Sequence, residues 1–201
     1  MVTAIRDQLR ARLRTRAGYS PGAVTVILDS QSVKASETVS KRTRGWDHPK
    51  RINGRKRHLV VDSGGLQVMV MVTPAHYSDR DVAREVLFRL RLTHPEITIV
   101  WADSAYAGGL VDWARTFLNL TLKTVSRPKD DQGFVLLPRR WVVERSLSWV
   151  MRARRNIRDH ERLPPVSEAM LAWSSIIQMS RRLTRPRTAA SSWTTTAKTA
   201  A

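Results

Sequence analysis

Three carboxylates stand where the sequence could support metal-dependent chemistry. Asp29 follows residues 24–28 (VTVIL), a β-branched run that predicts a buried strand, and Asp103 follows a similar run at 97–102 (ITIVWA). Glu144 lies farther along, in a predicted helix. Sites in α/β proteins are usually built where strands end, so one sheet edge could collect all three. Oxygen ligands of this kind suit Mg²⁺ or Mn²⁺. Two such ions about 4 Å apart can activate a nucleophilic oxygen and stabilise the leaving oxygen of a phosphodiester.

Each carboxylate also has a plainer interpretation. An aspartate directly after a strand is ordinarily a cap or turn residue. Glu144 lies four residues after Arg140 on one helix face, and such a surface pair contributes only about 0.3–0.5 kcal/mol. The second strand-end aspartate and the many nearby arginines favour the catalytic interpretation.

The helix that carries Glu144 is predicted to run from Pro138 to Arg152. Proline suits the first turn of a helix, where its missing N–H is not needed. Val143, Leu147 and Val150 recur at helical spacing and form an apolar stripe with Glu144 at its rim. The carboxylate can therefore stand at the boundary between core and solvent.

Strands and helices alternate through the rest of the chain. Residues 58–62 and 66–72 predict an antiparallel hairpin with Asp62 in its turn. A helix capped near Ser78 or Asp79 follows, with Val82, Val86, Leu87 and Leu90 on its buried face. A helix is then predicted over 110–118, with Phe117 among its apolar residues, followed by a strand over 120–125 and a polar loop over 129–133. A further helix is predicted through 170–179, after the helix that carries Glu144. This order predicts an α/β fold in which a mixed sheet has helices on both faces.

The pattern divides the chain into three parts. Residues 1–22 are predicted to be a basic lead-in, residues 23–185 one catalytic domain, and residues 186–201 a disordered, low-complexity tail. A length of 201 residues suits one domain with appendages.

The charge balance points to a polyanionic partner. Thirty-five Lys and Arg against seventeen Asp and Glu give a net charge of +18, so nucleic acid is the first candidate. No apolar run is long enough to span a membrane and no secretory signal is visible, so we expect a cytoplasmic, nucleoid-associated protein. The absence of cysteine excludes disulfides, thiolate zinc sites and a cysteine nucleophile. An RNA-binding protein of the ribosomal kind would share the charge but would not explain two strand-end aspartates.

Cations concentrate in two regions. Residues 34–58 predict a loop that grips a phosphate backbone, with Trp46 and an Asn53-Gly54 turn among the cations; a flexible, solvated loop is the alternative. The second region is the Glu144 helix and the residues after it. The residues expected to contact DNA are Lys34, Arg55, Lys56, Arg57, Arg140, Arg145, Arg152 and Arg155.

Four motifs carry a resemblance to a known family. They are residues 28–34 (LDSQSVK), 54–62 (GRKRHLVVD), 101–106 (WADSAY) and 140–149 (RWVVERSLSW). Together they resemble the DDE transposases of bacterial insertion sequences, in particular the insertion-sequence-five-like group. The resemblance implies a ribonuclease-H-like core with Asp29, Asp103 and Glu144 as the metal-binding triad. It also implies hydrolytic nicking at transposon ends, strand transfer into target DNA, and a second copy of the chain as a partner on DNA.

Two departures from the family pattern bear on activity. Leu137 and Met151 stand where the family carries Tyr and Lys, so basic roles there pass to Arg152, Arg154 or Arg155, or are lost. Full-length members carry an N-terminal helical domain that recognises the terminal repeats, whereas 28 residues precede Asp29 here. We therefore expect an upstream reading frame or partner to supply that domain. The alternative is a catalytically inactive remnant that acts only as a non-specific DNA-binding protein.

Overall fold

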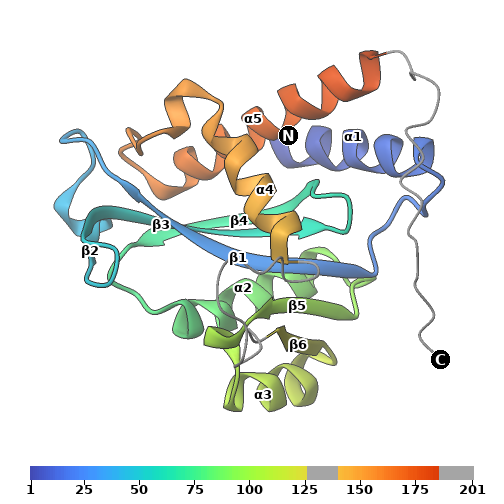
Figure 1. Cartoon of the computed structure of the whole chain (residues 1–201), viewed down its shortest axis with the longest axis horizontal. Helices are drawn as coiled ribbons and strands as arrows, with labels where there is room; N and C mark the ends of the chain where they lie inside the picture. The colour runs from blue at the N-terminus through green and yellow to red at the C-terminus, as the bar shows by residue number, and fades with distance from the viewer. Residues whose placement is uncertain (126–139, 186–201) are drawn as a thin grey trace, which may run out of the picture.

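The computed structural model describes residues 1–125 and 140–185 (Figure 1). The sequence predictions for the polar loop at 129–133, for Leu137 and Pro138, and for the tail at 186–201 fall outside these residues. No helix in the described part of the chain is both long and apolar enough to cross a membrane.

Six strands form one mixed sheet in the order β4-β3-β1-β5-β6, with the short β2 beside β4 on the outer edge of β3. Strands β1, β3 and β4 pair antiparallel, whereas β1, β5 and β6 pair parallel. This is the predicted α/β class, and the strand order is that of a ribonuclease-H-like fold. The strands are β1 (Thr25–Lys34), β2 (Gly45–Asp47), β3 (Ile52–Asp62), β4 (Gln67–Pro74), β5 (Ile99–Asp103) and β6 (Thr121–Val125).

Helices cover both faces of this sheet (Figure 1). One face carries α2 (Asp79–Thr93) and α3 (Gly109–Leu118), and the other carries α1 (Val2–Arg16), α4 (Arg140–Met151) and α5 (Pro164–Thr184). Single turns of 3₁₀ helix lie at Lys41–Thr43, Ser104–Tyr106 and Arg154–Asn156.

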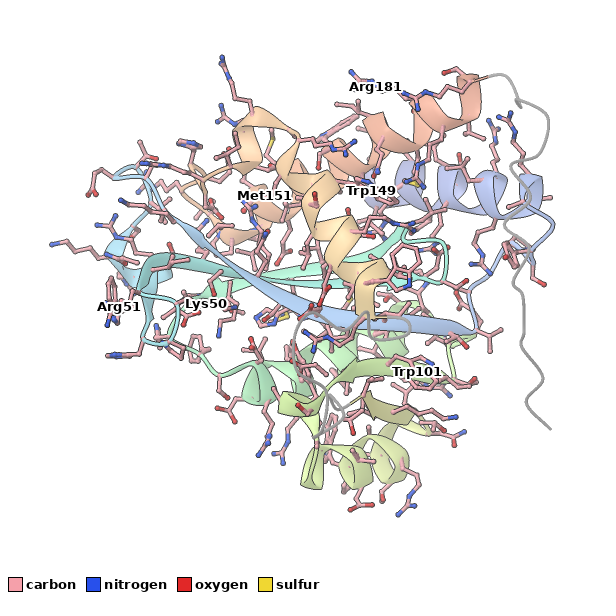
Figure 2. All side chains as sticks on the ribbon, viewed as in Figure 1. Lys50, Arg51, Trp101, Trp149, Met151 and Arg181 are labelled. Atoms are coloured by element: carbon pink, nitrogen blue, oxygen red, sulfur yellow. The ribbon has the colours of Figure 1, made fainter. Side chains whose placement is uncertain are left out.

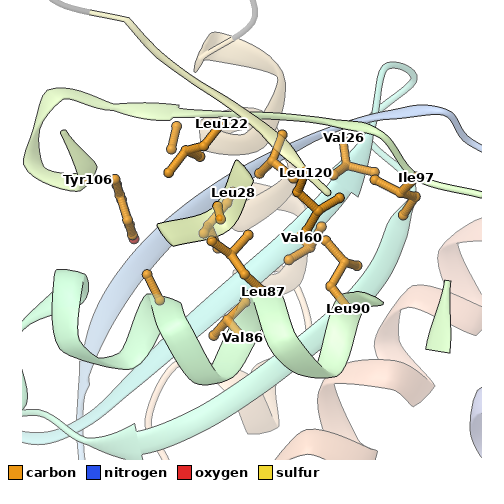
Figure 3. Close-up of a cluster of buried hydrophobic side chains, with 14 of the residues drawn as sticks. Val26, Leu28, Val60, Val86, Leu87, Leu90, Ile97, Tyr106, Leu120 and Leu122 are labelled. Atoms are coloured by element: carbon orange, nitrogen blue, oxygen red, sulfur yellow. The ribbon is translucent and has the colours of Figure 1, made fainter. Parts of the chain in front are cut away.

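Alternation along β1 assigns its side chains to two separate cores. Val26 and Leu28 face α2 and α3 and belong to the larger apolar cluster, which Figure 3 shows around Leu87. Ile27 points the other way and packs with Val143 and Leu147 of α4. A residue two places from Ile27 on β1 must therefore face α4.

Residues 2–16 form a helix, α1, where the sequence predicts only a basic lead-in. Helix α1 packs beside α5, and its buried residues are Arg6, Arg10 and Arg14. Arg14 pairs with the fully buried Asp62 at 2.9 Å and donates to the carbonyl oxygen of Gly22 at 3.1 Å. Because the buried face consists of arginines, a search for apolar periodicity does not detect this helix.

The basic stretch at 34–58 contains strand at both ends and in the short β2, with turns and loop between them, which corrects the predicted loop in part. Strand β1 continues to Lys34, and β3 begins at Ile52, so Asn53 and Gly54 lie in a strand and not in a turn. A Cβ on Gly54 would lie 1.8 Å from the carbonyl oxygen of Val33, so this position has room only for glycine. The hairpin, α2, α3, β6 and α5 are confirmed, and Phe117, one of the apolar residues of α3, is 71% exposed.

Candidate active site and nucleic-acid surface

Sheet register brings Asp29 and Asp103 together on the face that α4 covers. The parallel pairing of β1 with β5 ends at Ile27 opposite Trp101, and both side chains pack in the α4 cluster. Continuing this register by two residues places Asp29 beside Asp103, on the same face, where the strands part. Asp103 ends β5 as predicted, but Asp29 lies in the middle of β1, because β1 continues as an antiparallel partner of β3.

The carboxyl group of Asp29 is strongly affected by its surroundings. Burial is the main cause that raises its pKa to about 6, and the nearby charges of Asp103 and Glu144 raise it further. The N–H of Ser30, which donates to Asp29 at 2.7 Å, and the Arg140 guanidinium lower this pKa. Asp29 therefore lies within the electrostatic reach of both other carboxylates and loses its proton only near neutral pH.

Helix α4 presents Glu144 from above the sheet. Val143 and Leu147 are buried against Ile27, whereas Glu144 is exposed and pairs with Arg140 at 3.2 Å. The predicted arrangement of an apolar stripe with Glu144 at its rim is therefore confirmed. Since Arg140 acts on both Glu144 and Asp29, its guanidinium is the cation among the carboxylates.

The donor chemistry at this site fits a hard divalent cation, because it offers carboxylate oxygens only. Burial is the main cause of the raised pKa of Asp29, and a cation would relieve the repulsion from Asp103 and Glu144 that adds to it. Asp103 at present accepts a hydrogen bond from the N–H of Ala105 at 2.9 Å, and Glu144 is held by Arg140. Within residues 1–125 and 140–185, no three acidic or histidine side chains are gathered closely enough to hold a metal ion.

The family model of the transposase DDE domain matches residues 20–178. The chain belongs to the transposase DDE domain family. No curated protein matches its sequence.

Several solved structures show a likeness to this chain at low sequence identity. The catalytic core domain of BIV integrase has a TM-score of 0.43 and 14% identity, with 82% of this chain and 100% of that chain covered. The catalytic domain of Mos1 mariner transposase has a TM-score of 0.42 and 11% identity, with 88% and 87% covered. A chain of the simian T-cell lymphotropic virus intasome has a TM-score of 0.47 and 14% identity, with 77% of this chain covered. This chain spans 47% of that intasome chain.

Three cations of this DDE domain that were predicted to contact DNA are buried in β3, and we correct their assignment. Arg55 is fully buried, Lys56 pairs with Asp79 at 3.2 Å, and Arg57 donates to the carbonyl oxygen of Asn156 at 2.7 Å. Burial lowers the pKa of Arg57 to about 10, while Asp159 opposes this shift. These side chains hold parts of the domain together and cannot reach a phosphate.

The other predicted DNA contacts lie at the surface or partly exposed. Lys34 and Arg152 are exposed, and Arg155 is exposed but pairs with Glu161 at 2.8 Å. Arg140, as described above, pairs with Glu144.

Trp141 and Trp149, to which the sequence pattern assigned no role, position Arg145, the last predicted DNA contact. The Arg145 guanidinium lies over Trp141 at 4.2 Å and over Trp149 at 4.6 Å from the ring centroids. The three side chains recur every four residues, a spacing that places them on one face of a helix. That spacing was the signal available in the sequence.

Proposed function

We propose that this chain is the catalytic domain of an insertion-sequence-five-like DDE transposase that nicks transposon ends and transfers the freed strand into target DNA. The single observation that supports the proposal is that the charges of Asp103 and Glu144 both act on the buried carboxyl group of Asp29. Its partners would be transposon-end and target DNA, a second copy of the chain, and an upstream DNA-recognition domain. Its place would be at the nucleoid.

Asp29, Asp103 and Glu144 would hold the divalent ions, Mg²⁺ or Mn²⁺ and two in number. When bound, such ions activate the attacking oxygen and stabilise the leaving oxygen. The chain's own task is to present three ionised carboxylates, so Asp29 must lose its proton, which favours pH above about 6. Glu144 must exchange Arg140 for the ion. A partly exposed pair contributes no more than about 1 kcal/mol, so this exchange costs little.

The test is Asp103→Asn, assayed by nicking of a supercoiled plasmid that carries the DNA flanking the reading frame. The chain should be used alone and fused to any overlapping upstream frame. Loss of a metal-binding charge should abolish nicking in Mg²⁺ or Mn²⁺, while DNA binding stays equal or tightens slightly, because a carboxylate that repels phosphate is gone. Asp112→Asn on α3 is the matched control, since Asp112 is exposed and pairs only with Arg115 among the described residues.

A variant with Asp103→Asn that nicks as fast as the parent would rule out this residue as a metal ligand. If the parent itself binds DNA but never nicks in either form, the inactive remnant becomes the better description. Met151 specifically favours this second candidate: the family carries a lysine there, and here the thioether lies 3.6 Å from the buried Arg57 guanidinium.

A further inference from the structure

A groove of about 470 Å³ lies between α4 and α5, and four of its nine lining residues are arginines. Trp149 and Arg152 line it from the α4 side, and Arg181, Arg182 and Arg185 line it from the α5 side. Figure 2 shows Trp149 and Arg181 on the same side of the sheet. None of the lining residues is acidic.

The positive charge of this groove lacks a counterion within the described residues. None of its four arginines forms an ion pair there, in contrast to Arg14, Arg55 and Arg140 elsewhere. Burial is the first cause that lowers the pKa of Arg182, and the nearby Arg145 lowers it further. The carboxylate that acts on Arg182 is Asp62, which already pairs with Arg14 at 2.9 Å. Guanidinium groups stay charged despite such shifts, so the groove retains its repulsion until an anion enters it.

A structural role at the end of α5 does not account for these arginines. The last carbonyl groups of a helix need donors, and basic side chains often supply them. Here Arg16 of α1 does so, donating to the carbonyl oxygens of Leu183 and Arg185. Arg181 and Arg185 are exposed and remain available for an external ligand.

Trp149 holds the groove in a fixed shape. Arg182 lies over its ring at 4.1 Å, and Arg145 lies over the same ring at 4.6 Å. Cation–π contacts of this kind fix the guanidinium groups before a ligand arrives. Since two guanidinium groups already occupy the ring, it is not free to stack on a base, and recognition must act through phosphate.

We propose that the α4–α5 groove binds the phosphodiester backbone of duplex DNA, as a contact separate from the carboxylates and independent of sequence. The inference rests on the proposed function only in taking DNA as the polyanion. Trp149 lies five residues beyond Glu144 on α4, about 7.5 Å along the helix axis. That is about two base pairs of a duplex, so one DNA molecule can reach both sites.

The test compares the double variant Arg181→Ala/Arg185→Ala with the parent in binding to a labelled duplex of scrambled sequence over a series of salt concentrations. Each lost phosphate contact lowers the slope of log K against log salt by about 0.9, so two should lower it by about 1.8. The same relation predicts binding weaker by about 30-fold at about 0.15 M salt.

Arg89→Ala/Arg115→Ala is the matched control. It removes the same charge from α2 and α3 on the opposite face, at exposed arginines that pair with Glu85 and Asp112. This control should leave the slope nearly unchanged, and circular dichroism should show both variants folded. A groove variant that binds like the control would overturn the proposal. Tighter binding of an RNA duplex, lost in the same variant, would overturn DNA as the ligand.

The binding assay separates this inference from the proposed catalytic function. If the protein never nicks DNA but the groove variant shows the predicted decrease in salt slope, the groove proposal stands and the catalytic proposal fails. If the protein nicks DNA but the groove variant binds like the control, the catalytic proposal stands and the groove proposal fails.

Discussion

Arg55 should act in folding and not in DNA binding, although the sequence suggests the opposite. Its side chain is fully buried and uses all five of its N–H donors. Three go to backbone carbonyl oxygens, of Thr43 at 2.9 Å, Glu161 at 2.8 Å and Arg162 at 3.0 Å. The other two go to the Thr43 hydroxyl at 2.8 Å and to the Asp159 carboxylate at 3.1 Å. No donor remains for a phosphate.

The cost of Arg55→Ala follows from what it leaves behind. Asp159 stays in the interior, and its remaining donors within residues 1–125 and 140–185 are the Ser167 hydroxyl at 2.6 Å and the Glu161 N–H at 3.0 Å. Removing one partner of a buried ion pair costs about 3–5 kcal/mol. For a chain of this size each kcal/mol shifts the melting temperature by about 2–4 °C, so we expect a drop of about 6–20 °C. Arg55→Met with Asp159→Asn should lose less than Arg55→Met alone, because no unpaired charge stays buried.

Thermal melting followed by circular dichroism measures the loss of stability in Arg55→Ala. A DNA-binding assay below the melting temperature of the variant measures whether Arg55 contributes to DNA binding. Lys34→Ala is the contrasting variant, because Lys34 is exposed. It should leave the melting temperature unchanged and lower the salt slope by about 0.9 if it contacts a phosphate. The reasoning fails if Arg55→Ala melts with the parent and lowers the salt slope as a phosphate contact would.

Two further predictions concern the carboxylate site and the hairpin that supports α4. The pKa of Asp29 is raised from its ordinary value of 3.8 to about 6 in the folded protein. Between these two pH values the folded state binds more protons than the unfolded state, so the contribution of Asp29 to stability falls as pH rises. Asp29→Asn should therefore raise the melting temperature at pH 7, and this gain should disappear below about pH 4. Mn²⁺ should stabilise the parent protein less below about pH 6, because bound metal needs the ionised carboxylate. Gly65 has φ +80°, and a Cβ there would lie 2.7 Å from the Ser146 hydroxyl and 3.2 Å from the Trp149 ring. Gly108 has φ +92°, but no atom lies within 4 Å of a Cβ built there, so Gly65→Ala should lower the melting temperature more than Gly108→Ala. Equal losses would mean that backbone strain alone causes them.

Most strands and helices were predictable because their apolar spacing is local. The runs that became β5 and β6, and the stripe that anchors α4, needed no knowledge of distant residues. Helix α1 was not predictable in this way, because its buried face consists of Arg6, Arg10 and Arg14. Arg14 can be buried only because Asp62, 48 positions away, meets it inside the fold. A partner so distant in sequence leaves no local signal.

The site divides in the same way. Asp103 at the end of β5 and Glu144 four residues after Arg140 follow from local patterns, and the structure confirms both positions. The burial of β3 could not be predicted locally, because Arg55 and Arg57 donate hydrogen bonds to groups that lie 99 to 107 positions downstream. Before those partners are known, a buried arginine and a DNA-binding arginine look alike in the sequence.

This distinction changes what the net charge of +18 can predict about DNA binding. Arginines such as Arg14, Arg55 and Arg57 have their donors directed to carboxylates and carbonyl oxygens inside the protein. They release no counterions from DNA, so they add nothing to the salt dependence of binding. The arginines of the α4–α5 groove lack such partners among the described residues and lie on the α4 face of the sheet, as Asp29 and Asp103 do. The measured salt slope should therefore follow the exposed arginines of this face, and it should be much shallower than the total number of cations suggests.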